Sequence, residues 1–267
     1  MKLRRSLALA ATAAVAIGVS ALGPASATAQ EAAAVDYVAL GDSYSSGVGA
    51  GSYDEASGDC RRSTVAYPEL WAAANAPTSF AFPACSGATT ADVLDSQLGS
   101  LDAATTLVSI SIGGNDAGFA DVMTTCVLQG TDACLSAVGT ATSFIDAELP
   151  GRLDTVYGAI SGGAPNAQVV VLGYPRIYQL DGDCAFGISE ESRAAINSAA
   201  DALHDVTSAA AAGHGFAYGD VRPAFTGHEI CSGDEWLNST TLPVVDSYHP
   251  NAAGQSGGYY AVMESLA

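Results

Sequence analysis

Three serine side chains stand close together in the stretch VALGDSYSSG, where an apolar segment runs into a polar turn. They belong to Ser43, Ser45 and Ser46, and a serine hydroxyl becomes a nucleophile only when a neighbouring base removes its proton. Ser43 comes three residues after Leu40, the last apolar residue, where a side chain emerges from the end of a strand. We therefore predict Ser43 as the nucleophile and assign the other two serines to the turn. Asp42 is expected to cap backbone N–H groups there.

The base required by such a serine is most often a histidine, and the chain has four, at positions 204, 214, 228 and 249. His249 stands in DSYHPN, where Asp246 precedes it by three residues. A carboxylate at that spacing in a tight loop can bind one ring nitrogen and leave the other for the serine. From the residues alone His249 is the preferred base, and the other three histidines remain alternatives.

An acyl-transfer site also needs hydrogen-bond donors that stabilise a negatively charged oxygen. Asn115 in GGND offers a side-chain amide, and Gly87 in CSGATT offers a backbone N–H in a bend that suits glycine. The N–H of Ser43 is a third candidate donor. Each motif taken alone is also typical of an ordinary turn.

Short apolar segments precede GDSYSSG, PACSGATT, GGND and GYPRIYQ and are predicted to be strands. They cover residues 35–40, 78–82, 107–112, 168–172 and 216–218. Their lack of polar alternation indicates strands buried on both faces, as in a parallel sheet. In such sheets ligands bind at the carboxyl ends of the strands, so the motifs are expected to meet at one edge.

Helical patterns alternate with these strands. We predict helices over residues 64–75, 90–98, 144–160, 189–212 and 252–265. Pro150 interrupts the third of these and indicates either a kink or a new start. The alternation predicts an α/β fold with a mainly parallel sheet of about five strands.

The first 29 residues have the build of a secretory signal peptide: a basic start, an apolar run and an Ala27-Thr28-Ala29 cleavage site. Residues 30–267 are then expected to form a single domain. This remainder has six arginines, no lysine and 28 acidic residues, a formal net charge of −22. Such a balance argues against nucleic acid and anionic membrane surfaces as partners. We expect an extracellular monomer without stable membrane insertion.

Six cysteines lie in the exported part, an even number that predicts three disulfides among 15 possible connectivities. The simplest choice pairs them sequentially, as Cys60–Cys85, Cys126–Cys134 and Cys184–Cys231. Zinc-ligand spacing is absent from the sequence, so we predict neither a metal nor another cofactor.

Together these motifs resemble the four blocks of the SGNH hydrolases, also called GDSL lipases and esterases. The resemblance rests on Gly41-Asp42-Ser43, Gly87, Gly113-x-Asn115-Asp116 and Asp246-x-x-His249, which occur in this order along nearly all of the exported chain. It implies a three-layer α/β/α, flavodoxin-like fold, with Ser43 as nucleophile and His249 as general base. The oxyanion hole would comprise the N–H groups of Ser43 and Gly87 and the side chain of Asn115.

The six-cysteine layout is similar to the secreted bacterial branch of this family, which carries three sequential disulfides. Asp246 would orient His249, although some members use a backbone carbonyl, for which Ser247 is the local candidate. Asp116 is expected to anchor the loop of Asn115.

The resemblance implies a secreted carboxylic ester hydrolase, a lipase or esterase that cleaves acyl esters such as acylglycerols through an acyl-enzyme. Phospholipase A1 and carbohydrate acetyl esterase activities are alternatives at the same site. A secreted binding module on an inactivated hydrolase fold is an alternative of another class.

Overall fold

Five parallel strands form the central sheet, in the order β2-β1-β3-β4-β5. They are β1 (Asp36–Gly41), β2 (Ser79–Ala81), β3 (Leu107–Ser111), β4 (Gln168–Leu172) and β5 (Ala217–Gly219). The computed structural model describes residues 34–184 and 187–267, and the expected signal peptide (residues 1–29) lies outside the described residues. The strand order is that of flavodoxin-like proteins, in which the order reverses next to β1.

The strands at the centre of the sheet are buried along nearly their whole length because both of their faces are covered. In β3 every residue is buried, and in β4 only Gln168 is exposed. Leu40, Ile110 and Val170, one from each of the three neighbouring central strands, are fully inaccessible to solvent. The sequence predicted this burial on both faces, because its apolar segments do not alternate regularly with polar residues.

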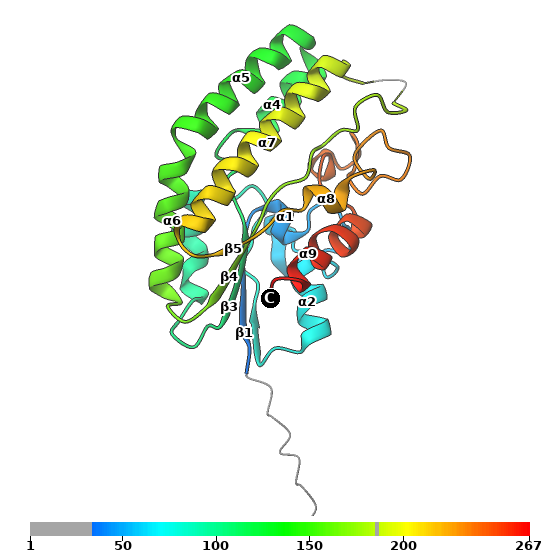
Figure 1. The fold of residues 1–267 in the computed structure, drawn as a ribbon. Coiled ribbons are helices and arrows are strands. Elements are labelled where there is room, and N and C mark those ends of the chain that lie inside the picture. Colours follow the sequence, from blue (N-terminus) through cyan, green and yellow to red (C-terminus); the bar gives the residue numbers. More distant parts are fainter. Residues whose placement is uncertain (1–33, 185–186) are drawn as a thin grey trace, which may run out of the picture. The chain divides into compact units, whose positions relative to one another are not determined.

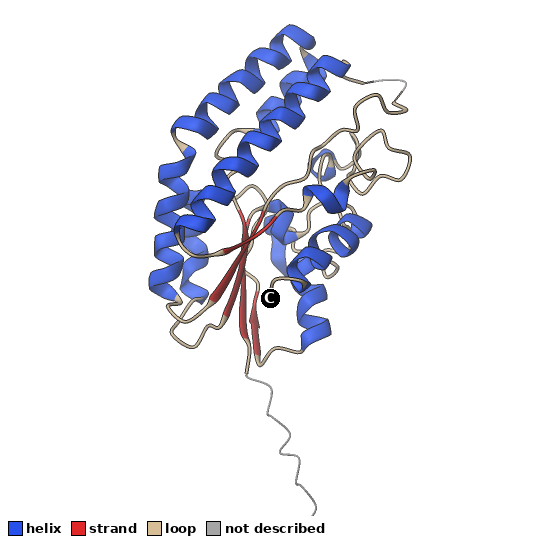
Figure 2. Ribbon diagram, viewed as in Figure 1, coloured by secondary structure: helices blue, strands red, loops and turns tan. Residues whose placement is uncertain are grey.

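Helices cover both faces of the sheet and produce the three-layer fold that the resemblance implies (Figures 1 and 2). On one side lie α5 (Thr131–Ala147), α6 (Leu149–Gly163) and α7 (Glu190–Gly213), and α4 (Phe119–Leu128) packs against α5 beyond the carboxyl ends of the strands. The other side is covered by α1 (Ser43–Ser46), α2 (Tyr67–Asn75), α8 (Arg222–Phe225) and α9 (Ala261–Glu264). The predicted fold class is confirmed.

Several predicted helices begin, end or divide elsewhere. The helix expected over residues 144–160 is two helices, because the chain turns at Glu148 and Pro150 occupies the first turn of α6. Pro is tolerated there because the N–H groups of a first turn have no intrahelical partner. Residues 90–98 form α3 (Thr90–Asp92) followed by η2 (Val93–Gln97), and residues 254–260 also wind as a wider helix, η5 (Gly254–Tyr260). The sequence analysis did not predict α4 or the first part of α5.

Three disulfides link segments that lie outside the strands. Cys60–Cys85, Cys126–Cys134 and Cys184–Cys231 close loops with sequence separations of 25, 8 and 47 residues. These are the sequential pairs of the three-disulfide branch that the sequence resembles. Within residues 34–184 and 187–267, none of the helices has the length and apolar character that crossing a membrane requires.

Candidate active site

Ser43 lies at the carboxyl end of β1, as the first residue of the single-turn helix α1. The Asp42 side chain caps this turn by accepting a hydrogen bond from the Tyr44 N–H at 3.0 Å. Gly47 ends the turn in the left-handed conformation, with φ of 83°. The short turn thus fixes the Ser43 side chain at the sheet edge, where the residue as a whole is 6% exposed.

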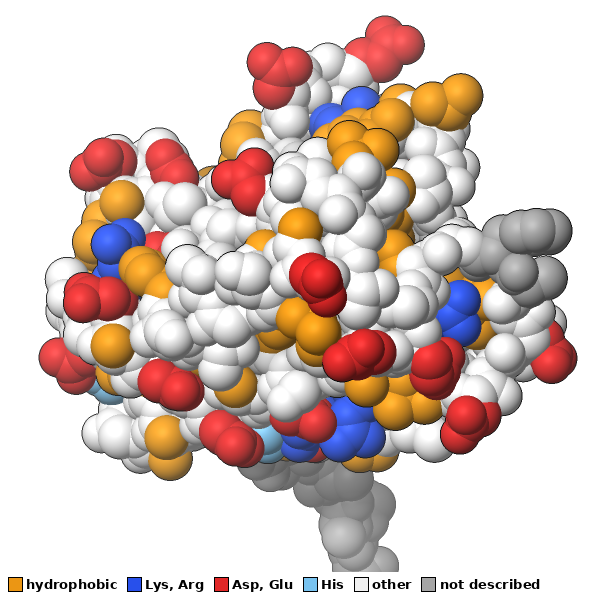
Figure 3. Space-filling view, turned by 90° about the horizontal axis from the view of Figure 1, so that it is seen from above, with side chains coloured by type: hydrophobic (Ala, Val, Ile, Leu, Met, Phe, Trp, Pro, Cys, Tyr) orange, Lys and Arg blue, Asp and Glu red, His pale blue; other side chains and the backbone are white. Residues whose placement is uncertain are grey.

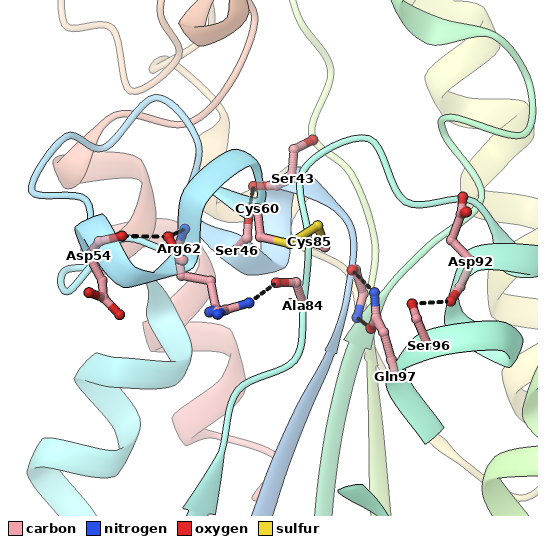
Figure 4. The surroundings of a disulfide bond; sticks show 12 residues. Ser43, Ser46, Asp54, Cys60, Arg62, Ala84, Cys85, Asp92, Ser96 and Gln97 are labelled. Carbon is pink, nitrogen blue, oxygen red and sulfur yellow. Dashed lines mark hydrogen bonds between the residues drawn. A yellow bond between two sulfur atoms is a disulfide. The ribbon is translucent and has the colours of Figure 1, made fainter. Parts of the chain in front are cut away.

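The backbone before the turn leaves no room for a side chain at position 41. Gly41 has φ of 122°, and an added Cβ would lie 2.5 Å from the Ser111 carbonyl oxygen. Gln97 from η2 binds both polar groups of Gly41, its Oε1 accepting from the N–H at 2.7 Å and its Nε2 donating to the carbonyl at 2.9 Å. Figure 4 shows this amide beside the strand end. Gln97 therefore holds the strand end that carries the nucleophile.

His249 meets Ser43 directly, although the two are 206 residues apart in the sequence: His249 Nε2 lies 2.7 Å from Ser43 Oγ. Its Nδ1 lies 3.0 Å from the carbonyl oxygen of Ser247. A carbonyl only accepts hydrogen bonds, so Nδ1 must carry the proton and Nε2 presents its lone pair to the serine. The Tyr44 hydroxyl donates to the Tyr248 carbonyl at 2.7 Å and fixes the histidine loop against α1.

The carboxylate of Asp246 is engaged elsewhere, contrary to the prediction that it orients His249. Its Oδ1 accepts from the Tyr53 hydroxyl at 2.9 Å and from Arg61 Nη2 at 2.8 Å. The Arg61 guanidinium also lies 4.4 Å over the Tyr53 ring. The Ser247 carbonyl, the alternative left open by the sequence, occupies the orienting position. Asp246 instead ties the histidine loop to the segment that follows the nucleophile.

Two loops carry the predicted oxyanion donors Gly87 and Asn115, and hydrogen bonds join these loops. Asn115 Nδ2 donates to the Ala88 carbonyl at 3.0 Å, which leaves the second amide hydrogen for a ligand. Gly87 has φ of 80°, and an added Cβ would meet no atom within 4 Å, so the space beside its Cα is open. Ser43, Gly87, Asn115 and His249 all line one groove.

Asp116 makes the second connection between these loops, in accord with the expected anchoring role. Its two carboxylate oxygens accept from the Thr90 N–H at 2.9 Å and from the Thr90 hydroxyl at 2.6 Å. The Asp116 side chain is fully buried, and Arg152 lies 3.5 Å away. A buried carboxylate with these partners fixes the distance between the Gly87 loop and the Asn115 loop.

The first loop is also held covalently on its other side. Figure 4 shows the Cys60–Cys85 disulfide, which lies two residues before Gly87, and the hydrogen bond from Ser46 to the Ser43 carbonyl. The Ser86 N–H donates to the Cys60 carbonyl at 3.1 Å across the same link. The Gly87 loop is thereby fixed relative to the nucleophile turn before any ligand arrives.

Burial changes the pKa values of two groups in the site. It lowers the pKa of His249 to about 4, although the hydrogen bond with Ser247 opposes this shift. The imidazole is therefore neutral at pH 7 and available as a base. Burial raises the pKa of Asp42 to about 6, and hydrogen bonds from Tyr174, Tyr44 and Ser111 limit the rise.

Two apolar spaces meet at Ser43. We call the first the inner cavity; it reaches between α4, α5 and α7, and its walls include Phe119, Met123, Val138, Ile145, Ile196 and Leu203. We call the second the outer groove; it contains His249, and its walls include Val127, Leu128, Val244 and Val245. A compound bound at Ser43 therefore has apolar surroundings in both directions.

Sequence reasoning missed one side chain that borders the site. Tyr174 follows β4 and donates its hydroxyl to Asp42, while the Gly114 N–H donates to the same hydroxyl at 3.2 Å. Tyr174 thus connects the nucleophile turn to the Asn115 loop and also lines the inner cavity. Its place in GYPRIYQ, at the carboxyl end of a predicted strand, was the available signal.

Comparisons with known proteins agree on one family. The family model described as “GDSL-like Lipase/Acylhydrolase family” matches residues 39–256. “Lipase 1” of Streptomyces coelicolor is 61% identical over 255 residues, which cover 95% of each chain. The crystal structure of phospholipase A1 from Streptomyces albidoflavus NA297 has 64% identity and a TM-score of 0.86, covering 88% of this chain and 100% of that one. The extracellular lipase of Streptomyces rimosus has 63% identity, a TM-score of 0.86 and the same coverage.

Proposed function

The chain belongs to the GDSL-like lipase and acylhydrolase family, and from this we propose that it hydrolyses the acyl esters of lipids at Ser43. The observation that carries the proposal is the 2.7 Å contact between His249 Nε2 and Ser43 Oγ at the junction of the two apolar spaces. A nucleophile bonded to its base beside donors for an oxyanion is the arrangement that acyl transfer needs.

In the first half of the reaction, Ser43 Oγ attacks the ester carbonyl carbon while His249 Nε2 takes the hydroxyl proton. The Ser247 carbonyl keeps the imidazolium in place through Nδ1–H. The oxyanion accepts hydrogen bonds from the N–H groups of Ser43 and Gly87 and from the Asn115 amide. His249 then protonates the leaving alcohol oxygen, and an acyl group remains on Ser43.

In the second half, a water molecule takes the place of the departed alcohol next to His249. The imidazole removes a proton from this water as it attacks the acyl-enzyme carbonyl, and the same donors stabilise the second oxyanion. The carboxylic acid leaves when His249 returns the proton to Ser43 Oγ. The neutral imidazole at pH 7 supports this role, because each half begins with His249 as the base.

The surroundings of Ser43 support a lipid ester as substrate. The leaving alcohol must lie beside His249, which lines the outer groove, so the acyl chain extends toward the inner cavity. Buried apolar walls stabilise an alkyl chain by about 0.8 kcal/mol per buried methylene group. Because the walls of both spaces are apolar, an ester with an alkyl chain fits better than an acetylated sugar.

Two classes of lipid are candidate substrates, and they differ in the group esterified to the acyl chain. Acylglycerols are favoured because Lipase 1 of S. coelicolor and the S. rimosus enzyme carry the name lipase. Phospholipase A1 activity is the second candidate, favoured by the likeness to the S. albidoflavus enzyme of that name. Parallel rate measurements on trioleoylglycerol and phosphatidylcholine, dispersed identically in detergent, decide between the two.

The direct test of the proposed function is hydrolysis of p-nitrophenyl esters by wild type and by Ser43→Ala, with Ser46→Ala as the matched control. The Ser46 hydroxyl only reaches the Ser43 carbonyl, at 3.4 Å. We expect Ser43→Ala to lose activity by at least about 10³-fold and Ser46→Ala to stay within a few-fold of wild type. An inactive wild type, or an active Ser43→Ala, would refute the proposal.

We further propose secretion after cleavage behind Ala29, as a monomer. Three disulfides in the described chain suit an oxidising compartment, and the S. rimosus relative is called extracellular. N-terminal sequencing of the protein recovered from culture medium should begin at Gln30. A product that retains Met1, or that stays with the cells, would contradict this proposal.

A further inference from the structure

The exposed hydrophobic side chains of the described residues concentrate at one place. Large hydrophobic side chains are exposed at six positions in this part of the chain, and four of them line the outer groove. A fifth, Leu242, lies two residues before Val244 in the same loop. The five are Val127 and Leu128 at the end of α4, and Leu242, Val244 and Val245 in the histidine loop. Leu128 is 75% exposed, Leu242 85% and Val244 68%. We call these five side chains the apolar rim.

The rim is also free of charge in an acidic protein. Residues 122–131 and 236–245, which carry it, contain no Asp, Glu, Lys, Arg or His, whereas the whole chain has 28 acidic residues. The nearest following charge, that of Asp246, is paired with Arg61 at 2.8 Å. Figure 3, which views the molecule from above, shows hydrophobic side chains exposed among acidic ones, with few Lys or Arg side chains.

These properties select the kind of surface that fits the rim. An anionic membrane would be bound through clustered Lys and Arg, which the two rim segments lack. An uncharged interface rewards exposed Leu and Val side chains instead, because they leave water when they enter it. A second copy of this chain seated on the rim would close the outer groove, which borders Ser43 and His249. Because the proposed hydrolysis needs lipid to reach Ser43 through this groove, it favours lipid over a second copy at the rim.

We propose that the apolar rim docks the protein onto the surface of aggregated lipid without net charge, with the outer groove opening toward that surface. A lipid ester then passes from the aggregate to Ser43 along apolar walls without entering bulk water. The inference rests on the proposed ester hydrolysis at Ser43. The inference adds a binding partner, the uncharged lipid surface, to the proposed function. Ester hydrolysis by Ser43 and His249 does not by itself depend on this partner.

Binding can be measured without hydrolysis in the Ser43→Ala protein, by flotation with phosphatidylcholine vesicles. The test variant adds Leu128→Asp and Leu242→Asp, and the matched control adds Leu180→Asp. Leu180 is 43% exposed but belongs to neither rim segment and borders a different depression, together with Gln179 and Glu229. We expect the control to float like its parent and the double rim variant to bind at least tenfold more weakly. Equal binding by the two variants, or no binding by the parent, would overturn the proposal.

Activity separates docking from chemistry when Leu242→Asp is made in the active protein. We expect unchanged kcat/KM on dissolved p-nitrophenyl acetate, which also reports correct folding. Hydrolysis of p-nitrophenyl palmitate carried in phosphatidylcholine vesicles should fall at least tenfold. An equal loss on both substrates would assign Leu242 to the chemistry and contradict docking.

The remaining outcomes also decide the matter. Analytical ultracentrifugation of the parent at the assay concentration should give the mass of a monomer. If it gives a dimer, and if the Leu128→Asp and Leu242→Asp substitutions dissociate that dimer, the rim serves self-association and lipid docking is overturned. Rim-dependent vesicle binding by a wild type that hydrolyses no ester would leave docking standing and refute the proposed function. The two failures are therefore distinguishable.

Discussion

Both ring nitrogens of His249 have partners, and both partners contribute to its proposed role. Ser43 Oγ lies 2.7 Å from Nε2, and the Ser247 carbonyl lies 3.0 Å from Nδ1. The backbone carbonyl selects the tautomer but carries no full charge. Burial of the ring therefore lowers the pKa of His249, whereas a carboxylate in contact with Nδ1 would raise it.

The pH dependence of kcat/KM should report this low pKa. Because His249 must be neutral to accept the Ser43 proton, activity is expected to persist well below its ordinary pKa of 6.5 and to decline toward the lowered value of about 4. The measurement is kcat/KM on p-nitrophenyl butyrate across pH 3–9. An acid limb centred at or above pH 6.5 would contradict the assignment.

Stability must be followed over the same range, since two groups act on it in opposite directions. Folded His249 binds fewer protons than the unfolded chain between about pH 4 and 6.5, so this group destabilises the fold as pH falls through that window. Asp42, with its pKa raised from 3.8 to about 6, binds more protons when folded and acts oppositely. Activity recovered after return to pH 7 separates titration from unfolding.

Asp246 should be dispensable for proton transfer. Asn at this position keeps the size of the side chain and an acceptor for Tyr53 and Arg61, so Asp246→Asn is expected to retain kcat/KM within about tenfold of wild type. His249→Ala should lose at least about 10³-fold. Where a carboxylate is bonded to the catalytic imidazole, the corresponding Asp→Asn change costs about 10⁴-fold. A loss of that size in Asp246→Asn would restore the carboxylate as the orienting group.

At the scale of elements, two loops from different strands must hold the oxyanion donors at a fixed distance. The Asn115 loop follows β3, the Gly87 loop follows β2, and Thr90 at the start of α3 joins them through Asp116. A donor that is misplaced no longer stabilises the charge that develops in the transition state. The loop connection is thus expected to affect catalysis more than substrate binding.

Thr90→Val tests this expectation because it removes the hydroxyl and keeps the shape. The lost hydrogen bond to Asp116 Oδ1 should lower kcat by about tenfold with little change in KM, since loss of a whole oxyanion donor costs about 10²–10³. Thr90→Ser keeps the hydroxyl and should behave as wild type. A rise in KM with unchanged kcat would place the effect in substrate binding instead.

The elements show which parts of the fold the sequence predicts. The central strands were identifiable because burial on both faces leaves uninterrupted apolar residues, as in β4. The division of residues 144–160 into two helices at Glu148 was only partly predictable from the sequence, because Pro150 was its one signal. The three-residue spacing of Asp246 and His249 suggested that these two side chains bind each other. Asp246 binds Arg61 and Tyr53 instead, which lie 185 and 193 residues away in the sequence. Tyr174 was missed for the same reason, since Asp42 is 132 residues away.

At the scale of the whole molecule, the disulfides close loops of very different lengths. A cross-link stabilises mainly by restricting the unfolded chain, and the effect grows with loop length. For separations of 47 and 8 residues the chain-entropy relation gives about 4 and about 2.5 kcal/mol. Removing Cys184–Cys231 should therefore destabilise the fold more than removing Cys126–Cys134.

The comparison uses paired Cys→Ser variants of each disulfide and the free energy of unfolding in urea. The wild type should have an intact mass about 6 Da below that of the reduced chain, since each disulfide lacks two hydrogens. If loss of Cys126–Cys134 costs more than loss of Cys184–Cys231, native contacts rather than chain entropy determine the contribution.

The central claim is that Ser43 is the nucleophile and His249 its base, and a covalent trap tests it most directly. A p-nitrophenyl alkylphosphonate releases p-nitrophenol when the nucleophile attacks phosphorus, and it leaves a stable adduct that peptide mass spectrometry locates. We predict a single adduct on Ser43, formed at least about 10³-fold more slowly in His249→Ala. An adduct on another residue, or one that still forms in Ser43→Ala, would contradict the account.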